Sequence, residues 1–184
     1  MDARVSSCNR RWPPGRDLQA DLGFWKVARI RSRNEKALAR DCEAMGVPFY
    51  LPLYVKRARR RDNNKPRQSL LPLFTGYFPF VAREDNQRRL LETGRVAQIM
   101  EIPDQRRFVD DLLQIWKTLE SGTAILGVES ITPGQTVRIQ EGPLAGMTGI
   151  VKEVRDQRSL LLAVEAFQMA VCVQIGRLAV EVIQ

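Results

Sequence analysis

The most specific pattern in this sequence is VRIQEGPLAGMTGIVKEV, which occupies residues 137–154. β-Branched residues at both ends favour strands. The three glycines between them, Gly142, Gly146 and Gly149, allow a tight loop with positive φ where it is needed. Pro143 fixes the turn that starts this loop. The pattern therefore predicts two short strands joined by a tight loop.

Two apolar residues, Leu144 and Met147, stand on this loop among small and polar neighbours. If they lie beneath the strands, they plug the core of a small β-structure. If they are exposed, they form a contact patch for a partner. Physical reasoning on these residues alone favours core plugging and leaves the contact patch open.

The rest of the C-terminal segment, residues 131–184, contains no helical period. β-Branched runs recur at 137–139, 149–154, 160–164, 170–174 and 178–183. Five short strands within about 50 residues indicate a small barrel. The segment carries five Arg or Lys and five Asp or Glu, whereas an RNA-binding barrel would need phosphate neutralisation. A protein-binding barrel is therefore the better prediction.

Upstream of this segment, the first 120 residues alternate between helical and strand periods, as expected of an α+β sandwich. Strands are predicted at 24–30, 47–55, 70–81 and 96–102, helices at 32–45, 84–92 and 104–119, and a polar hairpin tip at 56–68. Residues 1–22 have no period and are predicted to be a flexible leader. Residues 121–130 are small and almost uncharged, which is typical of a linker. The predicted domains are therefore 23–120 and 131–184.

The first helix has recognisable ends. Ser32 and Glu35 form an S-x-x-E pattern that predicts a capping box, and Gly46 stands where a C-cap glycine belongs. Leu38, Cys42 and Met45 recur at helical spacing and would be buried. Burial of that stripe would expose three basic side chains on the opposite face: Arg33, Lys36 and Arg40.

The net charge of +8 is concentrated in one part of the chain. Residues 26–70 hold 13 Lys or Arg and 4 Asp or Glu, a local net charge of +9. The densest run of basic residues in this segment lies in the predicted hairpin tip, at Lys56, Arg57, Arg59, Arg60 and Arg61. Such a localised charge indicates a phosphate-facing surface, although a solubilising charge run is a common alternative.

Several classes of function are disfavoured by what the sequence lacks. Without histidine, catalytic triads and most zinc hydrolase sites are excluded. The three isolated cysteines predict neither a zinc site nor a disulfide framework and favour a reducing cytoplasm. No apolar run approaches the roughly 18 residues of a membrane span, and the first residues have no secretory apolar core. Carboxylate or lysine catalysis stays open in principle, but the acidic residues are scattered mostly beside Arg and Lys, as on a solvated surface. We therefore expect a non-enzymatic cytoplasmic monomer without a metal, cofactor or membrane segment.

The loop of residues 137–154, with Pro133-Gly134 before its first strand, resembles the KOW motif. KOW modules are SH3-like barrels of NusG-type transcription factors, one large-subunit ribosomal protein and related eukaryotic elongation factors. The N-terminal pieces, in order, resemble the NusG N-terminal domain: FWKV at 24–27, NEKA at 34–37, LPLY at 51–54, a basic hairpin, and LPLFTGYFPFV at 71–81. The sequence therefore resembles a NusG family elongation or antitermination factor across about residues 24–120 and 131–184.

The resemblance implies a polymerase-binding role for the N-terminal domain. In the family, an apolar concavity binds the clamp helices of the largest subunit of bacterial RNA polymerase, which modulates elongation, pausing and termination. Phe74 and Tyr77 occupy the matching positions, and Trp25 begins the strand that lines the concavity. The alternative is that Trp25, Phe74 and Phe78 are sheet core. Strand alternation puts Phe74 and Tyr77 on opposite faces unless the chain bends at Gly76.

The same resemblance suggests further partners. The basic helix face and hairpin would face upstream or non-template DNA, or nascent RNA. In the barrel, Leu144, Met147 and Phe167 match positions that contact Rho or a small-subunit ribosomal protein. Departures from the family pattern at Thr75, at 93–96 and at Gln168-Met169 indicate a specialised paralogue. A ribosome-associated or general RNA-binding KOW protein remains the alternative function.

Overall fold

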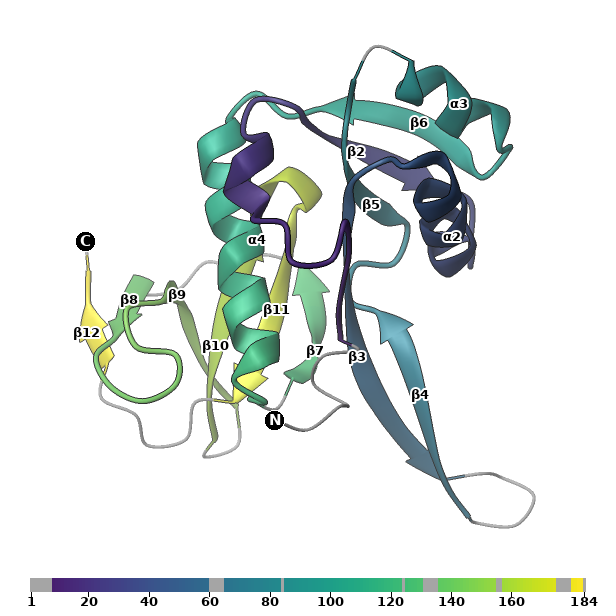
Figure 1. Cartoon of the computed structure of the whole chain (residues 1–184). Helices are drawn as coiled ribbons and strands as arrows, with labels where there is room; N and C mark the ends of the chain where they lie inside the picture. The colour runs from purple at the N-terminus through teal and green to yellow at the C-terminus, as the bar shows by residue number, and fades with distance from the viewer. Residues whose placement is uncertain are drawn as a thin grey trace.

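The protein is α+β, with two antiparallel sheets and three α-helices in the described residues (Figure 1). The computed structural model describes residues 8–59, 65–83, 85–123, 125–130, 136–154, 157–174 and 180–183. This confirms the predicted α+β class. The two sheets divide the chain near residue 120, with the three helices all in the N-terminal part.

The N-terminal sheet contains six strands in the order β1-β3-β5-β2-β6, with β4 paired to β3 outside this path. Their bounds are β1 Asn9–Trp12, β2 Trp25–Ile30, β3 Phe49–Arg59, β4 Pro66–Pro72, β5 Tyr77–Val81 and β6 Val96–Glu101. The register places Trp25 opposite Val81 and Lys26 opposite Glu101. The long pair β3–β4 forms the predicted hairpin and extends away from the body (Figure 1).

Helices cover both faces of this sheet. The helices α2 (Glu35–Met45) and α3 (Asn86–Glu92) pack on one face, where Phe78 and Phe80 join Leu38 and Leu90 in a buried cluster. On the other face, α4 (Gln105–Glu120) buries Phe108 and Leu112 against Val27 and Val81. Figure 1 shows α2 and α3 on the side of the sheet away from α4. The alternation of side chains along β2 and β5 produces these two cores.

The C-terminal sheet has the order β12-β8-β9-β10-β11-β7. Its strands are β7 Ile125–Ser130, β8 Thr136–Ile139, β9 Thr148–Val154, β10 Gln157–Val164, β11 Met169–Gln174 and β12 Val180–Val182. A 3-10 turn, η2 (Glu165–Phe167), connects β10 to β11. Val137, Leu162 and Val171 belong to the same buried cluster as the α4 residues. The C-terminal sheet therefore packs on the helix that covers the N-terminal sheet.

The prediction of a flexible leader is wrong for residues 8–22, which are folded onto the N-terminal sheet. Strand β1 pairs with β3, and a 3-10 turn, η1 (Leu18–Asp21), follows. The Asn9 side chain donates to the carbonyl oxygen of Trp116 at 3.1 Å and accepts from the Tyr50 hydroxyl at 2.8 Å. These bonds satisfy buried polar groups, which the apolar periodicity of a sequence cannot reveal.

The first helix begins later than predicted. Helix α2 starts at Glu35 after Asn34, because Arg33 adopts a left-handed φ of 64° that interrupts helical geometry. The Glu35 carboxylate accepts a hydrogen bond from the Gly76 amide at 2.9 Å. The predicted capping box is therefore wrong, since Glu35 stabilises a tertiary turn instead. The predicted glycine cap is confirmed, with Gly46 left-handed at φ 69°.

Two further segment predictions need correction. The predicted strand at 70–81 is two strands, β4 and β5, separated by a turn that ends at Gly76. The predicted linker at 121–130 is largely a strand, because β7 pairs with β11 along the edge of the C-terminal sheet. Small residues such as Gly127 conceal this strand from a pattern based on β-branched residues.

We expect Cys42 to make stability fall as the pH rises above 9. Burial, with smaller effects of the charges on Asp41 and Glu43, raises the pKa of its thiol to about 12 from 9.0. Between those values the unfolded chain loses a proton that the folded chain keeps, so folding becomes weaker with rising pH. Urea denaturation of wild type and Cys42→Ala at pH 8, 9 and 10 should give a steeper decline in wild type, by up to about 1 kcal/mol per pH unit. Parallel declines would contradict this expectation.

Candidate functional site

The two sheets meet at an aromatic cluster around Phe167. This side chain is 2% exposed and stands on the η2 turn, at the end of the C-terminal sheet that faces the N-terminal sheet. Its ring centroid lies 4.9 Å from Phe74, 4.8 Å from Tyr77 and 5.8 Å from Phe108. The Tyr77 ring is stacked on it, whereas the other two meet it edge to face. We call this cluster the aromatic junction.

The turn before β5 places Phe74 and Tyr77 on the same side of the chain. The Tyr77 amide donates to the Phe74 carbonyl oxygen at 3.3 Å, and Gly76 adopts a φ of 84°. A residue with a side chain would be strained at that φ. Phe78 points to the opposite face and packs on Phe49, with ring centroids 5.1 Å apart. The bend at Gly76 therefore overrides strand alternation, and both predicted residues face one partner.

Two charged residues hold this turn in place. Glu35, itself buried, accepts from the Gly76 amide, and the Arg29 guanidinium lies 4.4 Å from the centroid of the Tyr77 ring. Tyr77 is thus enclosed by Phe167 and Arg29. Sequence reasoning missed Arg29 and Glu35 as site residues. The pairing of Arg29 with Tyr77 across β2 and β5 is a matter of strand register, which the fold reveals and residue spacing does not.

A second contact joins the C-terminal sheet to α4. The Thr118 hydroxyl, which donates to the Gln114 carbonyl oxygen at 2.8 Å, lies 3.5 Å from the Met147 sulfur, and the Gln114 side-chain oxygen accepts from the Thr148 amide at 3.2 Å. Leu144 and Met147 are 1% and 5% exposed. In this arrangement they are therefore core residues, the reading favoured from the sequence, and Met147 also touches the helix.

Trp25 packs in the core against Phe108. It is 2% exposed, and its indole nitrogen donates to the Leu18 carbonyl oxygen at 3.0 Å. Its ring meets Phe108 edge to face with centroids 6.5 Å apart. Of the three residues predicted to bind polymerase, the structure brings Phe74 and Tyr77 together and leaves Trp25 in the core beneath them.

The predicted nucleic-acid residues are described only in part. Arg33, Arg40 and Lys56 are exposed, and Lys36 is half-buried with its ammonium donating to the Leu70 carbonyl oxygen. Arg57 and Arg59 stand in β3, but their side chains lie outside the described residues, as do Arg60 and Arg61 entirely. The Lys36 bond joins α2 to β4, so the basic helix lies beside the base of the hairpin.

The described residues hold no group of three or more Cys, Asp or Glu side chains placed to bind a metal ion. None of their helices combines the length and the apolar character needed to cross a membrane. No protein-family model and no curated protein sequence matches this chain.

Proposed function

We propose that the protein is a non-enzymatic, cytoplasmic transcription factor of the NusG type that binds bacterial RNA polymerase. In this proposal Phe74 and Tyr77 contact the clamp helices of the largest subunit, and binding modulates elongation, pausing and termination. The observation that carries the proposal is the aromatic junction, where both residues are held on one side of a glycine turn and covered by one side chain. The proposed role is that of a specialised paralogue acting as a monomer.

The geometry of the junction suits a partner helix. Paired aromatic rings anchored on a rigid turn are typical interface anchors, and an amphipathic helix inserts apolar side chains into such a site. Phe167 occupies the place that a partner's apolar side chain would take. Binding to polymerase therefore requires that the C-terminal sheet move away from Phe74 and Tyr77.

This requirement makes the C-terminal sheet a regulator of binding. We propose that it is an SH3-like KOW barrel that binds Rho or a small-subunit ribosomal protein through Leu144, Met147 and Phe167. All three are buried in the closed arrangement. If only the open form binds, the apparent dissociation constant rises by the reciprocal of the open fraction. A partner that holds Phe167 would strengthen polymerase binding, and polymerase would strengthen that partner's binding equally.

Arg40 on α2, Arg33 in the turn before this helix, and the β3–β4 hairpin provide the proposed nucleic-acid contact. Arg33, Arg40 and Lys56 are exposed, and phosphate contacts from such residues add affinity without sequence information. We propose that they lie along upstream or non-template DNA, or along nascent RNA, when the N-terminal sheet is on polymerase.

Substitution of Phe74 and Tyr77 tests the proposal. Each residue also holds Phe167, so the test is made in a Phe167→Ala background in which the junction is already weakened. Adding Phe74→Ala or Tyr77→Ala should weaken binding to immobilised core RNA polymerase by about 1–3 kcal/mol each. Leu91→Ala is the matched control, since Leu91 is exposed on α3 and should have no effect. If the variant that combines Phe167→Ala, Phe74→Ala and Tyr77→Ala binds polymerase as tightly as Phe167→Ala alone, Phe74 and Tyr77 are not part of the polymerase-binding surface.

The alternative function is general RNA binding or association with ribosomes. The observation that favours it is the hairpin, which extends from the body and carries the exposed Lys56 (Figure 1). It predicts RNA binding by the protein alone with a steep dependence on salt. Sedimentation with ribosomal particles in the absence of polymerase, together with no capture on core polymerase, would favour the alternative.

A further inference from the structure

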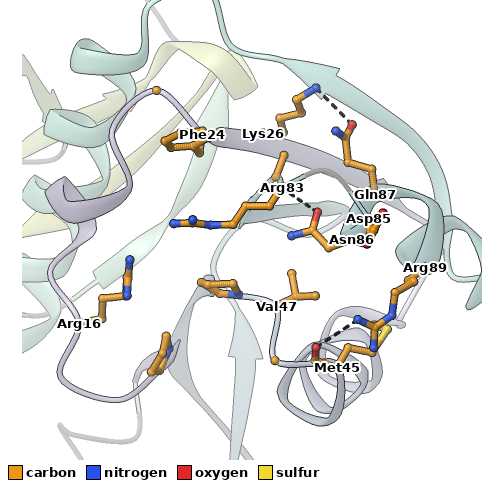
Figure 2. Close-up of a pocket in the computed structure, with 15 residues that line it drawn as sticks. Arg16, Phe24, Lys26, Met45, Val47, Arg83, Asp85, Asn86, Gln87 and Arg89 are labelled. Carbon is orange, nitrogen blue, oxygen red and sulfur yellow. Dashed lines mark hydrogen bonds between the residues drawn. The ribbon is translucent and has the colours of Figure 1, made fainter.

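A cationic groove lies on the N-terminal part of the protein, and none of its lining residues belongs to the aromatic junction. It is open, with a volume of about 1070 Å³. One wall is residues 13–24, which we call the strap, and the other comprises the end of α2 and the start of α3 (Figure 2). Figure 2 shows Arg16 and Arg83 extending toward each other below Phe24. We call this site the strap groove.

A buried carboxylate fixes the two arginines. Asp21 is 2% exposed, and its oxygens accept from Arg16 at 2.7 and 2.9 Å and from Arg83 at 3.2 Å. One negative charge therefore holds two positive charges side by side and leaves a net charge of +1. The side chains remain 39% and 56% exposed. Each guanidinium has more N–H groups than these bonds use, and they can serve a bound anion.

An exposed aromatic ring stands directly above this pair. Phe24 is 50% exposed although it adjoins the buried Trp25, and the Arg83 guanidinium carbon lies 5.3 Å from its ring centroid. An exposed phenylalanine costs solvation free energy, so its place on a groove wall beside a cation is informative. An aromatic face next to a phosphate-binding arginine is the arrangement that takes an unpaired nucleotide.

The remainder of the lining continues the positive charge toward α2. Lys26 donates to Gln87 at 3.2 Å and also pairs with Glu101 outside the lining. Arg89 donates to the Met45 carbonyl oxygen at 3.4 Å at the end of α2. Asp85 is the acidic residue among the lining side chains. The lining therefore holds four cations and one carboxylate, and the paired carboxylates Asp21 and Glu101 bring the net charge of the site to +1. A net positive charge suits an anionic ligand.

We propose that the strap groove binds single-stranded nucleic acid, with an unpaired base on Phe24 and its phosphate on the guanidinium N–H groups of Arg16 and Arg83 that Asp21 leaves free. Arginine guanidinium groups favour phosphate because their planar donors match its oxygens. The groove has room for more than one nucleotide, since typical ligand pockets are about 300–1,000 Å³. The proposed nucleic-acid contact does not involve the aromatic junction, so it can be tested independently of polymerase binding.

Photo-crosslinking of the full chain tests the position of the base. Oligonucleotides of twelve residues, one DNA and one RNA, would each carry 5-iodouracil bases and be irradiated with the protein alone. The proposal expects a crosslink on the peptide that contains Phe24, and the yields with the two oligonucleotides identify which sugar is preferred. Crosslinks confined to the hairpin, residues 56–68, would overturn it.

Matched substitutions test the energetics by fluorescence anisotropy with the same oligonucleotides. Phe24→Ala should weaken binding about tenfold, a typical loss for one stacked base, whereas Leu91→Ala should not change it. Arg83→Ala should weaken binding and lower the slope of log affinity against log salt by about 1. Arg16 still pairs with Asp21 in that variant, so the fold is retained, and circular dichroism would verify this.

The control for charge is Arg88→Ala, since Arg88 is 86% exposed on α3, the helix that follows Arg83, and lies outside the groove. Equal weakening by Arg88→Ala and Arg83→Ala would show that only overall charge matters and would overturn the proposal. Unchanged oligonucleotide binding by Phe24→Ala would also overturn the proposal. If a labelled oligoglutamate binds as tightly as the oligonucleotides, and the same substitutions abolish that binding, the groove is an acidic-peptide site and the proposal is overturned as well.

Discussion

Replacing Phe167 by alanine is expected to separate the C-terminal sheet from the N-terminal sheet. Phe167 is the centre of the aromatic junction and contacts Phe74, Tyr77 and Phe108 at once. Removing a buried phenylalanine costs about 3–5 kcal/mol. The hydrogen bond from the Thr148 amide to the Gln114 side chain is worth about 1 kcal/mol. The apolar packing of Leu162 and Val171 in the same buried cluster as α4 remains, so the substitution weakens the closed arrangement and favours its opening.

Small-angle X-ray scattering of the full chain is the direct measurement. We expect a larger radius of gyration for Phe167→Ala, with secondary structure unchanged by circular dichroism because the strand pairing within each sheet does not involve the Phe167 side chain. Phe24→Ala is the matched control, since it removes an exposed ring of the same size that is not part of the junction. An unchanged radius in Phe167→Ala would show that this side chain does not hold the sheets together.

Opening the junction also connects the structure to the proposed function. If the closed form dominates in the wild type, Phe167→Ala should bind core polymerase more tightly, by at most the reciprocal of the wild-type open fraction. A variant that opens but does not bind better would show that Phe74 and Tyr77 are not the polymerase surface. The Phe167 substitution therefore separates the conformational claim from the functional one.

Much of this fold follows from local sequence patterns. The α4 stripe at Phe108, Leu112 and Ile115 is buried as predicted, because a 3.6-residue period leaves little choice of face. The hairpin and the left-handed Gly46 are also as expected. These features depend on residues close together in the chain, where propensity and spacing carry the physical information.

The features that were missed depend on distant contacts. Strand β1 is stabilised by Asn9, whose partners Tyr50 and Trp116 lie 41 and 107 residues away. Glu35 is bound to the Gly76 amide, 41 residues away, so the local capping pattern was misleading. The sequence likewise does not show that Phe167 packs on Phe74 and Tyr77, although it indicates each of the three as a binding residue. The sequence indicated the right side chains but not that they cover each other.

Replacing Trp25 by alanine is expected to destabilise the N-terminal sheet by about 3–5 kcal/mol, the usual cost of truncating a buried aromatic residue. The ring packs on Phe108, and its indole donates to the Leu18 carbonyl oxygen, which fixes the strap to the sheet. The Gln105 side chain bonds both the amide and the carbonyl of Trp25, at 3.1 and 2.8 Å. Trp25 therefore joins the strap, β2 and the start of α4.

Urea denaturation, followed by circular dichroism because the substitution removes a tryptophan, measures this cost. Trp25→Phe separates the two contributions, because it keeps most of the packing and removes the indole hydrogen bond. We expect this variant to lose less unfolding free energy, about 1–3 kcal/mol, which is the cost of leaving the buried Leu18 carbonyl oxygen without a donor. Trp116→Phe is a control, since Trp116 is only partly buried. If Trp25→Ala is as stable as the wild type but no longer binds polymerase, Trp25 is part of the polymerase-binding surface, and this expectation is wrong. Because its ring is buried on the sheet side of Phe108, we expect reduced binding of this variant only in proportion to its unfolded fraction.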